Sequence, residues 1–195
     1  MSLPRPHTFP RFVSVLVFIA GVLLLVYARW SRPMLEGELE LDAGRTETAL
    51  HKYAAAEKRF GGYRITREVA AAEYARAVAN QLHLLYLAGR YDEVVEKASN
   101  APAGAAPHFW AGSALLARAL TEKAPESRLV WSSRAEEELR SALQAAPDDW
   151  DTKVNYELAA RWAAELRRPP AKKSDAPMQI LRPQPRQPEP TRKSG

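Results

Sequence analysis

The sequence predicts an all-α protein: a single N-terminal transmembrane helix, then degenerate tetratricopeptide-like helical hairpins, then a disordered tail. One long stretch near the N-terminus is apolar and carries no charge. The middle of the chain shows no sustained period-two alternation and is rich in Ala, Leu, Glu and Arg, which favour helices. Pro and Gly residues divide that middle into short segments. The predicted regions are a cytoplasmic N-terminus over residues 1–11, an anchor over 12–30, a helical repeat domain over 34–168 and a Pro-rich basic tail over 169–195.

The apolar stretch from Phe12 to Ala28 has 17 residues without a charge. As a helix it is about 25 Å long, and about 17 apolar residues is the lower limit for crossing the hydrocarbon core. Tyr27 and Trp30 fit the aromatic belt of one membrane interface, and Arg29 and Arg32 can extend into the headgroups beyond it. These features favour an uncleaved single-pass anchor.

Two other interpretations of this stretch stay open, namely a cleaved signal peptide and a buried core helix. Val26 and Ala28 place small residues before a cleavage point, but Arg29 directly after the cut is unfavourable. Orientation is weakly encoded, since Arg5 and Arg11 precede the stretch while further arginines follow it. We expect a cytoplasmic N-terminus, which in a bacterium places the anchor in the inner membrane and the soluble domain in the periplasm.

The net charge of +5 belongs to the ends of the chain. Residues 1–33 carry four Arg and no acidic residue, whereas residues 34–168 carry 18 basic and 21 acidic residues. A nucleic-acid-binding module carries its basic surface on the folded part, so we expect no nucleic-acid partner. The absence of Cys excludes disulfides, thiolate metal sites and cysteine nucleophiles.

The helices of the middle are expected between Gly and Pro breaks, and short connections between them predict antiparallel hairpins. Ala-Gly-Arg occurs twice, at residues 43–45 and 88–90, each time before an amphipathic segment. The expected helices lie near residues 34–42, 45–60, 65–88, 91–99, 107–123, 128–145 and 149–167.

The second helix of a tetratricopeptide repeat has the spacing A-x3-F-x2-A-x4-P, and one of these segments keeps its first three positions while another keeps all four. Small residues at these positions let two helices approach closely, and the larger residue fills the gap. The matching residues are Ala49, Tyr53 and Ala56 in the first segment, and Ala135, Leu139, Ala142 and Pro147 in the second, with Leu139 at the aromatic position. Near residue 89 the match is poorer, because Val94 and Ala98 replace the small and the large residue. An unrelated alanine-rich helical bundle remains the alternative.

The acidic cluster after Pro147 has two interpretations, a metal site or a helix start. Ca²⁺ takes six to eight oxygens, and the stretch lacks the Gly and the bidentate Glu of a calcium loop. We therefore favour Asp148 or Asp149 as an N-cap, with Asp151 in the first helical turn.

The helix expected from residue 149 to 167 is predicted to close the array. Its apolar side chains recur every four residues and are expected to pack on the preceding repeat, while a charged face covers the open end. The expected apolar stripe is Val154, Leu158, Trp162 and Leu166.

The ending A-x3-L-x2-A-L-x3-P-D-D-W-D-x-K-x-N-x-E-L-A, which begins at Ala135 and includes Asn155, resembles a known family. It is similar to the small membrane-anchored helical proteins encoded beside MoxR-type ATPases and von Willebrand factor A-domain proteins. Within that group it looks most like the MxaK-like proteins of methanol-oxidation gene clusters, and BatC-like tetratricopeptide proteins end similarly. The resemblance is specific over about 35 residues.

The resemblance implies an accessory role in the maturation of a periplasmic methanol dehydrogenase, including insertion of its Ca²⁺. It implies protein partners of three kinds: a MoxR-type ATPase, an A-domain protein or a dehydrogenase. It carries over no functional residue.

No catalytic, cofactor-binding or metal-binding residues are predicted. The histidines at positions 7, 51, 83 and 108 form no metal-binding pair, and Ser113 lacks the G-x-S-x-G of a nucleophile elbow. Glu136, Glu137 and Glu138 are consecutive, so they spread around a helix. We expect a protein that is not an enzyme and has no small-molecule substrate.

The candidate partner contacts are Phe109, Trp110 and Trp131, although core packing is the commoner role for such aromatics. The tail contains an apolar island at residues 178–181 that could bind a partner. The predicted function is a membrane-anchored interaction scaffold or assembly factor. The alternatives are a general envelope scaffold of a MoxR/A-domain system and a membrane-surface binder that acts through the basic tail.

Overall fold

The structure is a computed structural model that describes residues 8–168, and within this range it contains helices and no strand. The predicted all-α class is confirmed. The expectations for residues 1–7 and for the tail from residue 169 lie outside the described residues. The helices are α1 (Thr8–Asp42), α2 (Thr46–Gly61), α3 (Arg64–Val69), α4 (Ala71–Leu87), α5 (Tyr91–Ser99), α6 (Ala105–Thr121), α7 (Pro125–Ala145) and α8 (Trp150–Arg167).

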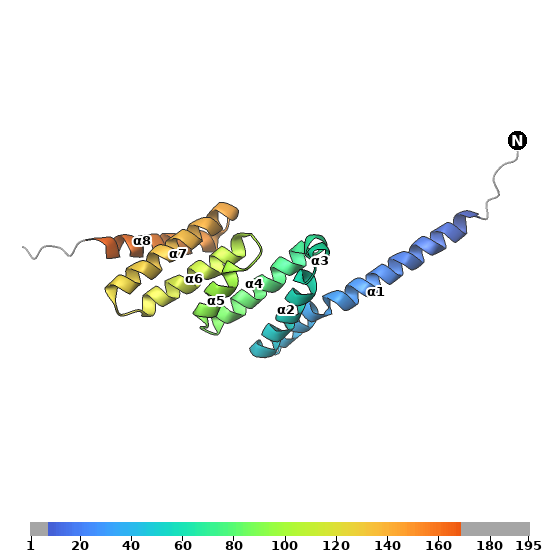
Figure 1. Cartoon of the computed structure of the whole chain (residues 1–195), viewed down its shortest axis with the longest axis horizontal. Coiled ribbons are helices and arrows are strands. Elements are labelled where there is room, and N and C mark those ends of the chain that lie inside the picture. Colours follow the sequence, from blue (N-terminus) through green and yellow to red (C-terminus); the bar gives the residue numbers. More distant parts are fainter. Residues whose placement is uncertain (1–7, 169–195) are drawn as a thin grey trace, which may run out of the picture.

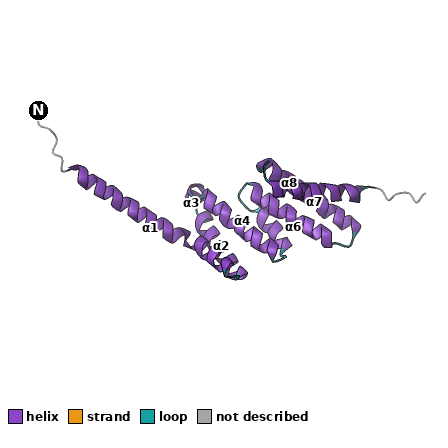
Figure 2. Cartoon of the chain, turned by 180° about the vertical axis from the view of Figure 1, so that it is seen from behind, coloured by secondary structure: helices purple, strands orange, loops and turns teal. Residues whose placement is uncertain are grey.

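The helices form an elongated array in which chain neighbours lie side by side (Figure 1). The second half of α1 pairs with α2, α4 with α5, and α6 with α7, while α8 packs mainly on α7 and also contacts α6 (Figure 2). The first half of α1 extends away from the array, and no residue from Phe12 to Arg29 is buried. This half is long and apolar enough to cross a membrane, and it is compatible with a single-pass anchor.

The sequence separated the anchor from a helix over 34–42, and the structure corrects this, because α1 runs unbroken through Pro33. A proline inside a helix has no N–H for the carbonyl four residues earlier, here that of Arg29. The Arg59 guanidinium of α2 supplies the missing donor. Its Nη1 lies 3.1 Å from the Arg29 carbonyl oxygen and 3.5 Å from that of Trp30.

Two other helix boundaries differ from the prediction. The segment expected as one helix over 65–88 is divided into α3 and α4 at Ala70, whose backbone leaves the helical region (φ −112°, ψ 39°) and whose side chain is buried in the first core cluster. Pro125 was expected as a break before residue 128, but it is the first residue of α7, a position that suits its fixed φ and its missing N–H.

The two Ala-Gly-Arg segments form the same turn. Gly44 and Gly89 have φ of +74° and +71°, a conformation that glycine adopts without strain. The N–H of Arg45 donates to the Glu40 carbonyl, and the N–H of Arg90 donates to the Leu85 carbonyl, each at 2.9 Å. The turn of the α1–α2 hairpin and the turn of the α4–α5 hairpin are therefore both of the Schellman type.

The repeat-packing residues predicted from the sequence are buried, apart from Pro147 and Asn155. Tyr53 and Leu139 lie where the paired helix has a glycine, since a Cβ added at Gly37 would stand 2.7 Å from Tyr53 and one at Gly112 would stand 2.6 Å from Leu139. The fully buried residues of the signature are Ala49, Tyr53, Ala56, Ala135, Leu139 and Ala142.

The hairpin of α4 and α5 reverses these sizes. Leu82 and Ala98 have the same separation along the chain as Gly37 and Tyr53, and both belong to the second core cluster. The large side chain therefore comes from the first helix of this hairpin, which explains the poorer match to the repeat spacing near residue 89.

We predict that Gly112→Ala lowers the free energy of unfolding by about 1–3 kcal/mol, because the added methyl overlaps Leu139. Leu139→Ala costs about 2–5 kcal/mol. The double variant should lose at least about 1 kcal/mol less free energy of unfolding than the sum of the two single losses. The reason is that the methyl added at residue 112 occupies the space that Leu139→Ala leaves empty. Denaturant unfolding in detergent, followed by Trp fluorescence, measures these values. Gly112→Ala combined with Tyr53→Ala, in a different hairpin, should be additive, and additivity in the Gly112–Leu139 pair would contradict the packing.

A second double-mutant cycle tests the hydrogen bond between Arg59 of α2 and the Arg29 carbonyl of α1. Arg59→Met should lower the free energy of unfolding by about 1 kcal/mol, because the Arg29 carbonyl loses its donor. In a Pro33→Ala background the helix supplies its own N–H, so the same change should cost clearly less. Lys58→Met, the neighbouring exposed change, serves as the control in both backgrounds. An equal cost of Arg59→Met with and without Pro33 would show that the carbonyl is not its target.

Ion pairs tie the first helices together and make stability depend on pH. The Lys52 amine at 2.6 Å, and then Arg32, lower the pKa of the Glu36 carboxyl. The folded chain therefore binds this proton less readily than the unfolded chain, so the pair stabilises the fold above about pH 4.3, the unfolded pKa of Glu. That stability is lost as the pH falls through the lowered folded pKa.

We predict that the free energy of unfolding falls between about pH 5 and pH 3, and that Glu36→Gln flattens part of this fall. The flattening should be partial, because the pKa values of Glu40, Glu93 and Glu122 are also lowered by their hydrogen-bond donors. Denaturant titrations across this pH range provide the measurement. An equally steep fall in Glu36→Gln and in the control Glu165→Gln would refute the assignment.

Candidate functional site

The acidic cluster before α8 is a helix start. The Asp149 carboxylate accepts hydrogen bonds from the Thr152 N–H (3.0 Å) and from the Thr152 hydroxyl, which confirms the predicted N-cap. Asp148 and Asp151 are exposed beside it. Within residues 8–168, no group of three or more His, Asp or Glu side chains is placed to hold a metal ion.

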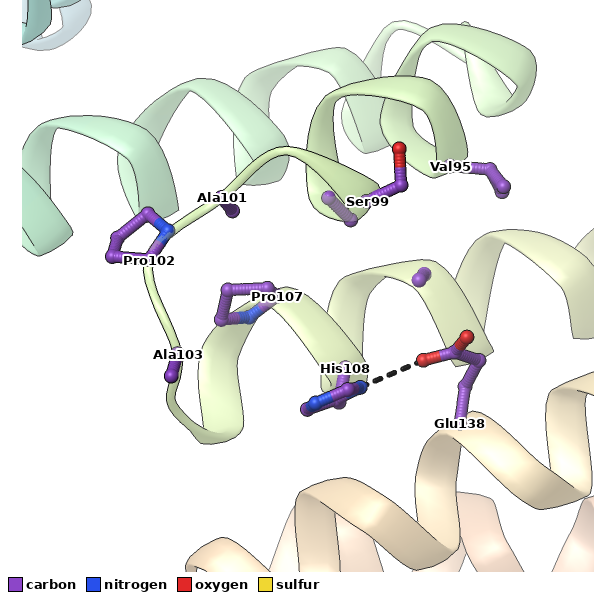
Figure 3. Close-up of a pocket in the computed structure, with 10 residues that line it drawn as sticks. Val95, Ser99, Ala101, Pro102, Ala103, Pro107, His108 and Glu138 are labelled. Atoms are coloured by element: carbon purple, nitrogen blue, oxygen red, sulfur yellow. Dashed lines mark hydrogen bonds and ion pairs between the residues drawn. The ribbon is translucent and has the colours of Figure 1, made fainter.

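A small cavity of about 190 Å³ lies between α5, α6 and α7 (Figure 3). His108 of α6 and Glu138 of α7 meet at its edge, with Nδ1 and Oε2 2.8 Å apart. Ser99 also lines the cavity, but its hydroxyl donates to the Glu96 carbonyl and points away from the imidazole. Among the residues drawn, no nucleophile lies beside the His108–Glu138 pair. The pair therefore serves as a hydrogen bond between α6 and α7.

Sequence reasoning missed this pair, since its members lie 30 residues apart in the chain. The register of the α6–α7 hairpin predicts the contact between His108 and Glu138. Gly112 meets Leu139, so the residue one turn before Gly112 comes close to the residue beside Leu139.

The three aromatic candidates for partner contacts are all half-buried at helix junctions. Trp110 stacks on His83 with ring centroids 4.8 Å apart, and Phe109 meets Trp110 edge-on at 4.9 Å. Trp131 lies under the guanidinium of Arg118, 4.4 Å from its ring centroid. The Trp110–His83 contact joins α6 to α4 and the Trp131–Arg118 contact joins α7 to α6, while the Phe109–Trp110 contact lies within α6. A role of these aromatics in binding a partner stays a prediction.

The expected apolar stripe of α8 is wrong in part. Its predicted inward side chains Val154 and Leu158 are 48% and 41% exposed, and Trp162 and Leu166 are half-buried. The buried residues of α8 are small, namely Thr152, Ala159 and Ala163.

A close approach of α8 explains this choice of face. Ala159 and Ala163 are fully buried, and small side chains let two helices come close. The Asn155 amide donates to the Ser113 hydroxyl of α6 at 3.2 Å, which fixes the rotation of α8 about its axis. The bulkier side chains of Val154 and Leu158 are consequently turned outward.

The outward side chains form a row that we call the α8 row: Trp150, Val154 and Leu158. Trp150 is 72% exposed. The three residues are four apart, so they lie on one helix face. The expected charged face of the final helix is exposed, as the Glu157–Arg161 pair shows, but α8 also presents an apolar row that was not expected.

Comparisons of the chain with protein-family models, with curated proteins and with solved structures find no match. Function is therefore inferred from the geometry of the described helices and from the resemblance at the C-terminal end. The α8 row is the strongest candidate for a functional surface, since it is apolar, exposed and positioned on a regular element.

Proposed function

We propose that this chain is a membrane-anchored scaffold or assembly factor that binds a protein partner through the α8 row. The observation that supports this function is the exposure of Trp150, Val154 and Leu158 on the last helix. The row lies on the helix farthest from the apolar half of α1 (Figure 1). The chain would thus combine a membrane attachment at one end with a docking surface at the other.

The proposed anchor is the first half of α1, in a bacterial inner membrane with the helical domain in the periplasm. An isolated helix with a continuous apolar surface from Phe12 to Tyr27 is unfavourable in water, and the hydrocarbon core removes that cost. Arg5 and Arg11 before the apolar stretch fit a cytoplasmic N-terminus, although Arg29 and Arg32 follow the stretch, so charge encodes this orientation only weakly.

The α8 row has the chemistry of a helix-binding surface. Three apolar residues at four-residue spacing suit the apolar face of an amphipathic partner helix. Tryptophan is enriched among residues that dominate binding energy, and Trp150 is the largest member of the row. Arg161 and Glu157 form an ion pair (3.0 Å) close to the row, which gives it a polar rim.

We further propose that the partner belongs to a methanol-oxidation system: a MoxR-type ATPase, a von Willebrand factor A-domain protein or a methanol dehydrogenase subunit. The support is the resemblance of the segment that begins at Ala135 to MxaK-like proteins. Trp150 and Leu158 of the row belong to the resembling residues. The scaffold would then assist maturation of the dehydrogenase, including Ca²⁺ insertion.

We predict that Trp150→Ser, Val154→Ser and Leu158→Ser together reduce partner recovery at least about tenfold, equivalent to about 1.4 kcal/mol. The measurement is a quantitative pull-down of the tagged full chain from gently solubilised host membranes, with partners identified by mass spectrometry. The matched control replaces two exposed leucines on other helices, Leu87→Ser and Leu120→Ser. This control should retain the partner.

Equal recovery by the triple variant and the wild type would reject the α8 row as the docking surface. Recovery of a MoxR-type ATPase, an A-domain protein or a dehydrogenase subunit would support the methanol-oxidation role. Other envelope proteins in its place would keep the scaffold and reject that role.

A further inference from the structure

The short helix α3 carries exposed apolar side chains that the docking surface on α8 does not explain. Ile65 and Val69 are 70% and 79% exposed and lie one turn apart on the same face. Tyr63, immediately before the helix, is 74% exposed. Three large apolar or aromatic side chains thus project from a segment of seven residues.

The contacts on either side of α3 place it at a definite level along α1. Before it, Phe60 meets Trp30 edge-on with centroids 5.0 Å apart, and Arg59 binds the Arg29 carbonyl. After it, the Glu73 carboxylate accepts a hydrogen bond from the Tyr27 hydroxyl at 3.0 Å.

Both flanks of α3 therefore contact α1 between residues 27 and 30, where the uncharged stretch ends. Figure 1 shows α3 between the ends of α2 and α4, at the side of the array toward the apolar half of α1. When this half of α1 spans a bilayer, α3 lies at the level of the headgroups.

The same region is rich in positive charge. The stretch from Lys58 to Val69 contains four basic residues and one acidic residue, Glu68, which pairs with Arg64. In the part of the chain that the structure describes, neither Arg29, Arg59 nor Arg67 forms an ion pair with a carboxylate. Arg67 instead donates to the Gly61 carbonyl at 2.8 Å, and its charge stays unneutralised.

We propose that α3 docks on the membrane that holds α1, with anionic phospholipid as its ligand. Tyr63, Ile65 and Val69 enter the boundary between headgroups and acyl chains, where aromatic and aliphatic side chains are stable. The surrounding arginines bind lipid phosphates, since a guanidinium donates paired hydrogen bonds to phosphate oxygens.

This contact rests on the membrane insertion of α1 but not on any protein partner. Because α1 tethers the segment beside the bilayer, the docking step is intramolecular and weak contacts are sufficient. Docking would give the domain a second attachment point and fix its rotation about the α1 axis.

The absence of cysteine allows a clean test in the full chain. Single variants Ile65→Cys, Val69→Cys, Leu24→Cys and Leu87→Cys are spin-labelled and reconstituted in vesicles of equal parts phosphatidylglycerol and phosphatidylcholine. Electron paramagnetic resonance then compares the accessibility of each label to oxygen and to a water-soluble nickel chelate. Leu24 marks the bilayer interior, and exposed Leu87 at the other end of α4 marks water.

We expect labels at 65 and 69 to be shielded from nickel at least about threefold relative to the label at 87. Nickel accessibility at 65 and 69 equal to that at 87, with the label at 24 inside the lipid, would overturn the docking of α3 and leave the anchor intact. An aqueous label at 24 would overturn the anchor and the docking together.

The role of charge is tested with Arg64→Glu in the Ile65→Cys chain. Arg64 is almost fully exposed and pairs with Glu68 one turn on, so this change should leave the fold intact. It should raise nickel accessibility at 65 at least about twofold. The matched control is Arg161→Glu, which alters an equivalent exposed pair on α8 and should have no effect. An unchanged label in Arg64→Glu, or equal shielding in phosphatidylcholine alone, would overturn the proposed recognition of anionic lipid.

Discussion

The hydrogen bond from Arg59 to the Arg29 carbonyl is the contact on which the arrangement of the molecule depends. Pro33 removes a donor from α1 at the point where the uncharged half of the helix meets the packed half. The α2 guanidinium replaces that donor, so α1 stays helical and α2 is held at a fixed height beside it. Trp30 and Phe60 then pack next to this bond. The positions of α3 and α4 along the α1 axis follow from that of α2, because both helices continue the chain from α2.

Pairs of one small and one large residue determine how the remaining helices meet. Gly37 with Tyr53 and Gly112 with Leu139 bring two backbones close together, and each pair sets the register of its hairpin. Register in turn decides which polar side chains face one another, as His108 and Glu138 do. At the last helix the same preference for small residues buries Ala159 and Ala163 and leaves the bulkier Trp150, Val154 and Leu158 outside.

Features with local causes were predictable from the sequence, and features with distant causes were not. The Ala-Gly-Arg turns, the Asp149 cap and most helix ends depend on nearby residues, and they were predicted. Continuity through Pro33 depends on a side chain from another helix, and propensity alone cannot show it. The outward face of α8 depends on the shape of α7. The periodicity of the sequence therefore predicted that apolar residues share one face of α8, but it could not predict whether this face points toward the array or toward solvent. The candidate aromatics Phe109 and Trp110 follow the commoner expectation of core packing.

The unbroken course of α1 past Pro33 also has a mechanical meaning. Its 17 uncharged residues span about 25 Å, somewhat less than a hydrocarbon core of about 30 Å. The proposed span and the packed half belong to one continuous helix, so a change in the tilt of the span would move the array with it. Displacement grows with distance from the membrane, and the α8 row belongs to the helix farthest from the apolar half of α1 (Figure 1). The thickness of the bilayer would thereby set how far above the membrane, and at what angle, the docking surface is held.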